Sequence, residues 1–211
     1  MDTQLNFINR SLAGHTAEIV LFQKNLALDM SALDVAWKVI RYCGRDCSHP
    51  VVFSQNFEVS VQDRWGNFTP RLAAEPGRSF ELVRGPVGGR LLRHCRREAA
   101  ATHAANGVIE VLNAQSQGAV DVCLYRGGVL LGCKTSVVPG QKAVFRYPPS
   151  LWIAVASEIT AGQAFQSAVL SEQAVELSLM GVARADLVMT GGGAGPAAGP
   201  YEFSLENVVA W

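Results

Sequence analysis

Two stretches of the chain follow the same residue pattern, and this internal repeat constrains the fold more than any other feature. The first stretch begins at Asn9 and reads N-R-S-L-A-G-H-T-A-E-I-V-L-F-Q, and the second begins at Asn113 and reads N-A-Q-S-Q-G-A-V-D-V-C-L-Y-R. Shorter matches follow, in which residues 51–53, 56–61 and 80–82 resemble residues 143–145, 151–156 and 175–177. The spacing between matched segments varies, which is typical of two copies of one module with different loop insertions.

The repeated segments have the composition of β-strands. Residues 5–9 and 18–22 are rich in Leu, Ile, Val and Phe and are bounded by Gly and Ser, a pattern that predicts short strands. Residues 56–62 alternate between apolar and polar side chains, which predicts a strand with one buried face. Residues 201–205 alternate in the same way and predict a closing strand.

A hairpin is the clearest local prediction. Two strand-like runs, 120–126 and 129–135, flank the dipeptide Gly127-Gly128, which favours a two-residue turn. In the simplest register Cys123 lies opposite Gly132, so Cys123 and Cys133 point to opposite faces. That register argues against a disulfide between these two cysteines.

These patterns predict a mainly β protein built as a tandem pair of antiparallel β-sandwich-like modules related by the repeat. We expect a first module over 1–85, a connector over 86–106, and a second module over 107–211. The connector ends in Ala-rich sequence before Asn106-Gly107, which predicts one short helix over residues 90–104.

Composition and charge narrow the classes of function. Hydrophobic residues make up 49% of the chain and charged residues only 17%, so few charges are available to cover an independent monomer. This favours a homo-oligomer, with a compact monomer whose two modules share a core as the alternative. Lys plus Arg and Asp plus Glu are both 18, so we expect no general binding to nucleic acid.

Targeting signals are missing from the sequence. The N-terminal residues lack the basic and apolar regions of a signal peptide, and no run of 18 apolar residues predicts a transmembrane segment. We expect a cytoplasmic protein, and export without a signal peptide stays open as an alternative.

The cysteines leave three alternatives open. The segment Cys43-Gly-Arg-Asp-Cys47-Ser-His49 has two thiols and an imidazole, but a zinc site needs four ligands, and its equivalent in the second copy has none of these residues. Reduced thiols are favoured over a local disulfide between Cys43 and Cys47 or a metal site completed from elsewhere. We predict no metal and no cofactor.

Candidate binding residues come from three segments. Trp65 and Asn67 lie in the turn-like segment Asp63-Arg-Trp-Gly-Asn67, which makes Trp65 the best candidate for an exposed contact. Arg93 and Arg97 belong to the basic cluster of the connector, which reads either as an anion contact or as a solvated helix face. Gly191, Gly192 and Gly193 open a Gly-rich arm, defined as residues 191–200, which lacks the Lys and Ser or Thr of a phosphate loop. This composition favours a mobile surface loop or an arm that docks on a neighbouring subunit.

No catalytic motif is present, so the sequence favours a non-enzymatic protein and assigns no catalytic residue; an enzyme with a site among the loops is the minority alternative. The first hypothesis is self-assembly or protein binding. The alternative is a carbohydrate- or lipid-binding module or a membrane-active effector, based on Trp65 and the apolar insert at residues 26–33.

Overall fold

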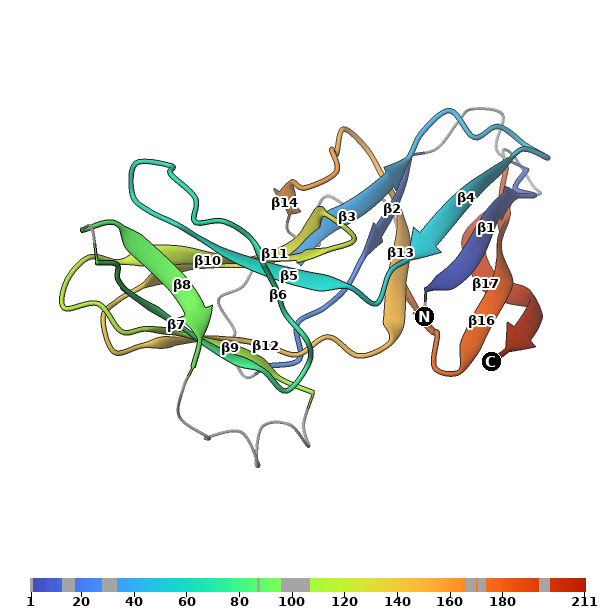
Figure 1. The fold of residues 1–211 in the computed structure, drawn as a ribbon. Coiled ribbons are helices and arrows are strands. Elements are labelled where there is room, and N and C mark those ends of the chain that lie inside the picture. The colour runs from blue at the N-terminus through green and yellow to red at the C-terminus, as the bar shows by residue number, and fades with distance from the viewer. Residues whose placement is uncertain are drawn as a thin grey trace. The chain divides into compact units, whose positions relative to one another are not determined.

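A computed structural model describes residues 2–12, 18–27, 34–86, 88–95, 107–165, 170, 174–193 and 198–211. Every regular element within these residues is a β-strand, and most strand pairs are antiparallel (Figure 1). The prediction of a mainly β protein is therefore confirmed. In this part of the chain no helix has the length and apolar character needed to cross a membrane.

The chain folds into two compact units. Unit 1 consists of Met1–Gln23, Asp34–Gln55 and Pro149–Trp211, and unit 2 of Lys24–Leu33 and Asn56–Pro148. The two segments of unit 2 thus alternate along the chain with the three segments of unit 1. These ranges divide the chain differently from the consecutive modules 1–85 and 107–211 that the repeat suggests.

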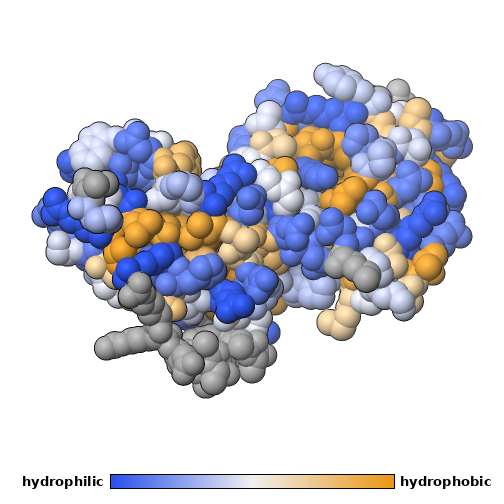
Figure 2. All heavy atoms as spheres, in the orientation of Figure 1, coloured by the Kyte–Doolittle hydropathy of each residue, from blue (hydrophilic) through white to orange (hydrophobic). Residues whose placement is uncertain are grey.

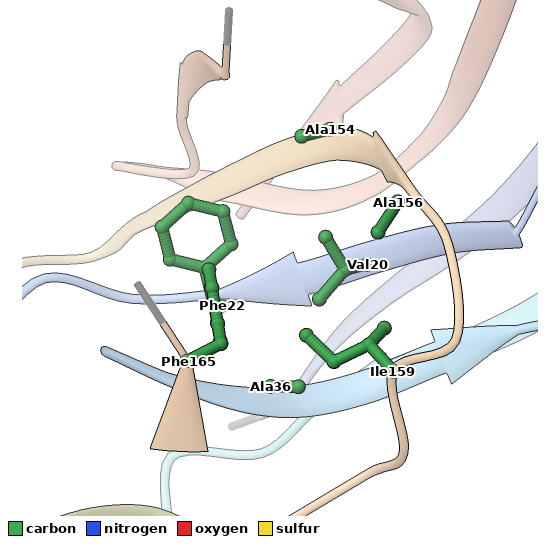
Figure 3. Packing of buried hydrophobic residues seen from close by; sticks show 7 residues of the cluster. All are labelled: Val20, Phe22, Ala36, Ala154, Ala156, Ile159 and Phe165. Atoms are coloured by element: carbon green, nitrogen blue, oxygen red, sulfur yellow. The ribbon is translucent and has the colours of Figure 1, made fainter. Parts of the chain in front are cut away.

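Unit 1 contains two sheets, with strand orders β17-β16-β1-β4 and β14-β3-β2-β13-β15. Its strands are β1 (Thr3–Asn9), β2 (Glu18–Phe22), β3 (Asp34–Ile40), β4 (Ser48–Phe53), β13 (Ser150–Ala156), β14 (Ala164–Phe165), β15 (Val175–Ser178), β16 (Val182–Gly192) and β17 (Gly199–Ala210). Buried apolar side chains from β2, β3, β13 and β14 pack together, with Phe22 and Phe165 in edge-to-face contact (Figure 3). Burial of this kind is the main stabilising term of a β fold.

Unit 2 also contains two sheets, with strand orders β11-β10-β5-β6 and β12-β9-β7-β8. Its strands are β5 (Phe57–Gln62), β6 (Leu72–Ala73), β7 (Ser79–Arg84), β8 (Arg90–His94), β9 (Ile109–Asn113), β10 (Val120–Arg126), β11 (Val129–Val137) and β12 (Lys142–Phe145). The alternation expected for residues 56–62 is present in part, since Phe57, Val59 and Val61 are all buried.

The two units pair their strands in the same order. β1 lies between β16, which is parallel to it, and β4, which is antiparallel; β9 lies in the same way between β7 and β12. β2 lies between β3 and β13, as β10 lies between β11 and β5. Next to these strands, β17 pairs with β16 in unit 1 as β8 pairs with β7 in unit 2. In the other sheet of each unit, β15 pairs with β13 as β6 pairs with β5. Each unit therefore combines strands from the first half of the chain with strands from the second.

Asn9 and Asn113 end the corresponding strands β1 and β9 and are both buried, with exposed fractions of 3% and 0%. Asn9 Oδ1 accepts from the Ser11 amide at 2.9 Å, and Asn113 Oδ1 accepts from the Gln115 amide at 3.2 Å. Each side chain thus closes a local turn two residues on, a role that suits Asn. Asn9 and Asn113, which begin the two stretches that resemble each other in the sequence, thus make the same contact.

The connector differs from the expected helix. Residues 90–94 form strand β8, which pairs with β7, and residues 96–106 lie outside the described residues. In β8, Leu92 is buried and its neighbours Leu91 and Arg93, which point to the opposite face of the strand, are more exposed. The prediction of a helix over 90–104 is wrong for its described part because pairing with β7 determines the backbone there.

The predicted hairpin is confirmed, but its register changes along its length. Gly127 and Gly128 have φ of 55° and 79°, as a two-residue turn of the favoured kind requires. Tyr125 pairs with Leu130, but an irregularity then shifts the register so that Cys123 lies directly opposite Cys133. The two cysteines therefore share a face, contrary to the expectation from the simple register.

We expect these two thiols to form a disulfide under oxidising conditions, although all five cysteines are free in the structure. Directly opposed residues of antiparallel strands have Cα atoms roughly 4.5–5.5 Å apart, within the range a disulfide spans. Hydrogen bonding to Cys123 and burial raise the pKa of the Cys133 thiol above its usual range, so the reaction should be slow at neutral pH and faster in alkali.

Incubation with an excess of a small-molecule disulfide tests this expectation, because two protein thiols and one such disulfide give one protein disulfide and two small thiols. Mass spectrometry should show a loss of two hydrogens and a linked 123–133 peptide. The Cys133→Ser variant should lack that peptide. A native protein that links only Cys43 to Cys47, or nothing, would contradict the register.

Candidate functional site

A groove of about 520 Å³ opens on unit 2. It is formed by the turn that follows β5, the β7–β8 hairpin and the segment after β9. Its lining combines aromatic, amide, hydroxyl and charged groups: Asp63, Trp65, Asn67, Phe68, Thr69, Pro70, Arg84, Gly88, Gly89, Arg90, Gln115, Ser116 and Gln117. Pockets that bind small molecules combine apolar surface with a few polar groups in this manner.

The turn over residues 63–67 is held by the carboxylate of Asp63. Asp63 Oδ1 accepts from the backbone amides of Trp65 at 2.8 Å and Asn67 at 3.0 Å, and Oδ2 accepts from Asn67 Nδ2 at 3.2 Å. Gly66 adopts a φ of +87°, which a side chain would strain. The sequence Asp-x-x-Gly-Asn therefore fixes a tight turn with Trp65 at its tip.

Asp63 stays ionised to unusually low pH. Burial raises the pKa of this carboxyl, but the hydrogen bonds from Asn67, Trp65 and Arg90 together outweigh burial and lower the pKa to about 2. A carboxylate with such a low pKa is a poor proton donor or acceptor near neutral pH. Its role in the groove is to position the turn.

The depressed pKa predicts a specific acid dependence. Ionised Asp63 stabilises the fold fully above the ordinary carboxyl pKa of about 3.8, and this contribution is lost as the pH falls from about 4 through about 2. Urea unfolding between pH 7 and pH 2 should show a decline in this window that is smaller in Asp63→Asn. Glu75→Gln, which alters an exposed ion pair with Arg78, should retain the decline of the native protein.

Two aromatic side chains line the groove without being covered. Trp65 is 65% exposed and Phe68 is 53% exposed. The guanidinium carbon of Arg64 lies 4.1 Å from the ring centroid of Trp65, and that of Arg90 lies 6.0 Å from it. These cation–π contacts help to hold the indole in one orientation, although much of its surface remains open.

Arg84 and Arg90 lie directly opposite each other on β7 and β8 and both line the groove. Arg90 Nη1 forms an ion pair with Asp63 Oδ2 at 2.5 Å, and Arg90 Nε donates to Gln115 Oε1 at 3.4 Å. Among the described residues, Arg84 forms no ion pair. Arg64 lies over the ring of Trp65, so the described residues at the groove include three arginines, and the described lining contains one carboxylate. This part of the molecule is therefore cationic, although the whole chain has no net charge.

The structure brings only some of the sequence-predicted site residues together. Trp65 and Asn67 lie in the groove. Arg93 Nε forms an ion pair with Glu81 Oε1 at 2.8 Å and does not line the groove, and Arg97 lies outside the described residues. Gly191, Gly192 and Gly193 belong to unit 1, at the end of β16 and just beyond it.

The local backbone structure explains why glycine occupies positions 191 and 192 of the Gly-rich arm. A Cβ at Gly191 would lie 1.9 Å from the carbonyl oxygen of Pro200, and one at Gly192 would lie 2.6 Å from the Tyr201 ring. Both glycines also have positive φ. The close approach of β17 to β16 therefore requires glycine here. Residues 194–197 of the arm lie outside the described residues.

Residues 43–47 form a turn that leads into β4, and His49 lies in β4 itself. Cys43 is buried, Cys47 is exposed, and the backbone amide of Cys47 donates to the Gly44 carbonyl at 3.1 Å. Within the described ranges, no three His, Cys, Asp or Glu side chains are arranged to hold a metal ion.

Several groove residues could not be found from the sequence. Gln115, Ser116 and Gln117 read only as a turn, and Asp63 carries no sign of its ion pair with Arg90. The pairing of β7 with β8 and of β7 with β9 brings these segments together, and it depends on contacts distant in sequence. The one usable signal was the Asp-x-Trp-Gly-Asn turn itself.

Comparison of the chain with models of protein families, with curated proteins and with solved structures finds no match.

Proposed function

We propose that the protein is a non-enzymatic binding protein and that the groove around Trp65 holds a saccharide. The observation that carries this proposal is the exposed indole of Trp65, presented on a turn that Asp63 holds in place with hydrogen bonds from Trp65, Asn67 and Arg90. A flat apolar ring held in one position costs little conformational entropy when a ligand stacks on it.

The surroundings of Trp65 favour a saccharide over an acyl chain. Asn67, Gln115 and Gln117 line the same groove and offer amide donors and acceptors to hydroxyl groups. An acyl chain would leave these amides without hydrogen bonds, which costs free energy. Asp63 is the one carboxylate among the described residues of the groove lining, and its low pKa supports binding in preference to acid–base catalysis.

A glycan array tests the proposal directly. The native protein should bind a subset of saccharides, and isothermal titration should confirm one site per chain for the best of them. Absence of binding to every saccharide in the array at high protein concentration would refute the proposal.

We propose further that each unit is a β-sandwich and that the chain is a duplicated module whose two copies have exchanged halves. Support comes from the shared order of strand pairing and from the matching turns at Asn9 and Asn113. In this interpretation the first copy gives β1–β4 to unit 1 and β5–β8 to unit 2, and the second copy gives β9–β12 to unit 2 and β13–β17 to unit 1.

Self-assembly through β17 is a second candidate function. This strand spans Gly199–Ala210 at the edge of its sheet, and Val208, Val209 and Trp211 at its end are exposed. Apolar side chains also lie among hydrophilic ones on the visible surface of both units (Figure 2). Long exposed edge strands can pair with another chain. Light scattering should show an oligomer of the native protein that Val208→Lys weakens; a monomer at every concentration would contradict this candidate.

A further inference from the structure

The pairing of β7 with β8 places two positive charges face to face. Arg84 and Arg90 are direct cross-strand neighbours, and like charges in this position destabilise a sheet. Asp63 compensates Arg90, but no described residue forms an ion pair with Arg84. The groove therefore carries one excess cation at a defined place in the fold.

The position of the Arg84 side chain is also defined. Its Nη2 atom lies 4.0 Å from the point where a Cβ on Gly88 would stand, so the guanidinium extends over the β7–β8 turn. Gly88 and Gly89 line the groove together with both arginines. Arg90 is held from one side by Asp63 and from another by Gln115. An incoming group would thus meet Arg90 in a fixed position and Arg84, with which no residue in the described part of the chain forms an ion pair.

We infer that Arg84 and Arg90 form a subsite for an anionic group, and that the saccharide bound beside Trp65 is an acidic one. This inference rests on the proposed saccharide function and adds the class of ligand. A carboxylate, such as that of a uronic acid, or a sulfate ester would relieve the repulsion between the two arginines. Guanidinium groups bind such anions with two parallel hydrogen bonds.

A nucleic acid also combines anionic and stacking groups, but the remaining surface favours it less. The chain has no net charge, whereas binding to a phosphate backbone uses cations spread along an extended surface. Here the described lining of the groove carries two arginines and one carboxylate beside Trp65. A groove of about 520 Å³ suits a short acidic saccharide better than a nucleic acid, whose backbone is contacted over an extended length.

Titrations with matched oligosaccharides test the inference. The probes are a neutral oligosaccharide, its uronic acid counterpart and its sulfated counterpart, which together separate the two sources of negative charge. The native protein should bind at least one acidic probe about tenfold more tightly than the neutral one, because a charge-assisted hydrogen bond contributes about this much. Raising the salt concentration should weaken only the acidic probes.

The Arg84→Gln variant separates binding from folding. It should lose most of the preference for the acidic probe and keep its affinity for the neutral probe within about twofold. Its thermal unfolding midpoint should be unchanged or higher, because the substitution removes the repulsion with Arg90. Arg45→Gln, at an exposed arginine of unit 1, should behave as the native protein in every titration.

Three results would overturn the inference. Equal affinity for neutral and acidic probes would exclude the anionic subsite and leave the proposed saccharide function intact. Failure of all saccharides to bind would remove the proposed function itself. Tighter binding of a single-stranded oligonucleotide than of any saccharide, lost in Arg84→Gln, would assign the same residues to a nucleic acid.

Discussion

Cleavage of the chain between Ala101 and Thr102 is expected to leave its two fragments tightly associated. In the structure, unit 1 takes β1 from the first fragment and β16 from the second, and unit 2 takes β5 from the first and β10 from the second. Separation would break these ladders and expose the apolar side chains that they bury, a cost far above that of parting two finished domains.

A protease site inserted at this position allows the measurement. After cleavage, the fragments should elute together in size-exclusion chromatography at the volume of the intact chain and separate only in denaturant. The uncleaved chain with the same insertion controls for the effect of the added residues. Fragments that separate in buffer and each retain the circular dichroism of folded β structure would show two consecutive modules without exchange.

Trp65→Ala is expected to abolish most of the saccharide affinity. Truncation of a central aromatic side chain in a binding site typically costs 2 kcal/mol or more, which corresponds to a loss of about 30-fold or greater. The effect on stability should be small because the indole is 65% exposed and the turn is held by Asp63. Titration calorimetry with the best saccharide from the array provides the measurement.

Tyr42→Ala is the matched control, because it removes an aromatic ring that is 87% exposed in unit 1 and does not line the groove. It should bind as the native protein does. Full saccharide affinity in Trp65→Ala would move the ligand away from the groove. Equal losses in both variants would indicate a nonspecific effect of exposed aromatic rings.

Short-range patterns predicted much of the fold. The Gly127-Gly128 hairpin is found because its turn type depends on two adjacent residues, and the closing strand at 201–205 is part of β17. The mainly β class follows in the same way from short apolar runs between turns. Each of these features depends on residues that are close in sequence.

Features that depend on distant partners were predicted poorly. The register shift between Leu124 and Tyr125 places Cys133 on the same face of the sheet as Cys123. The turn residues Gly127 and Gly128 do not indicate this shift. Residues 80–82 lie in β7, which pairs in parallel with β9, but residues 175–177, which match them in the sequence, lie in the edge strand β15, and β16 makes the parallel pair with β1. Choosing between these strands requires the parallel pairs β1–β16 and β7–β9, which join segments far apart in the chain.

The candidate site follows the same division. The exposed Trp65 could be predicted because the turn that presents it lies within five residues. The arginines that line the groove beside Trp65 could not be predicted, because Arg84 and Arg90 become neighbours only when β7 pairs with β8. The sequence predicted a helix for the connector. In a helix Arg90 would not lie opposite Arg84, so this cross-strand pair was not predicted.

The parallel pairing of β1 with β16 has a consequence for how the protein is made. Thr3 Oγ1 donates to the carbonyl of Val182, a residue 179 positions away, so β1 is synthesised long before β16, its parallel neighbour. Unit 2 ends at Pro148 and can complete its sheets while β16 is still unsynthesised. Until β13 and β16 are made, β2 and β1 each lack one neighbouring strand, and slow translation of the segment before β16 prolongs the exposure of these unpaired edges to aggregation and proteolysis.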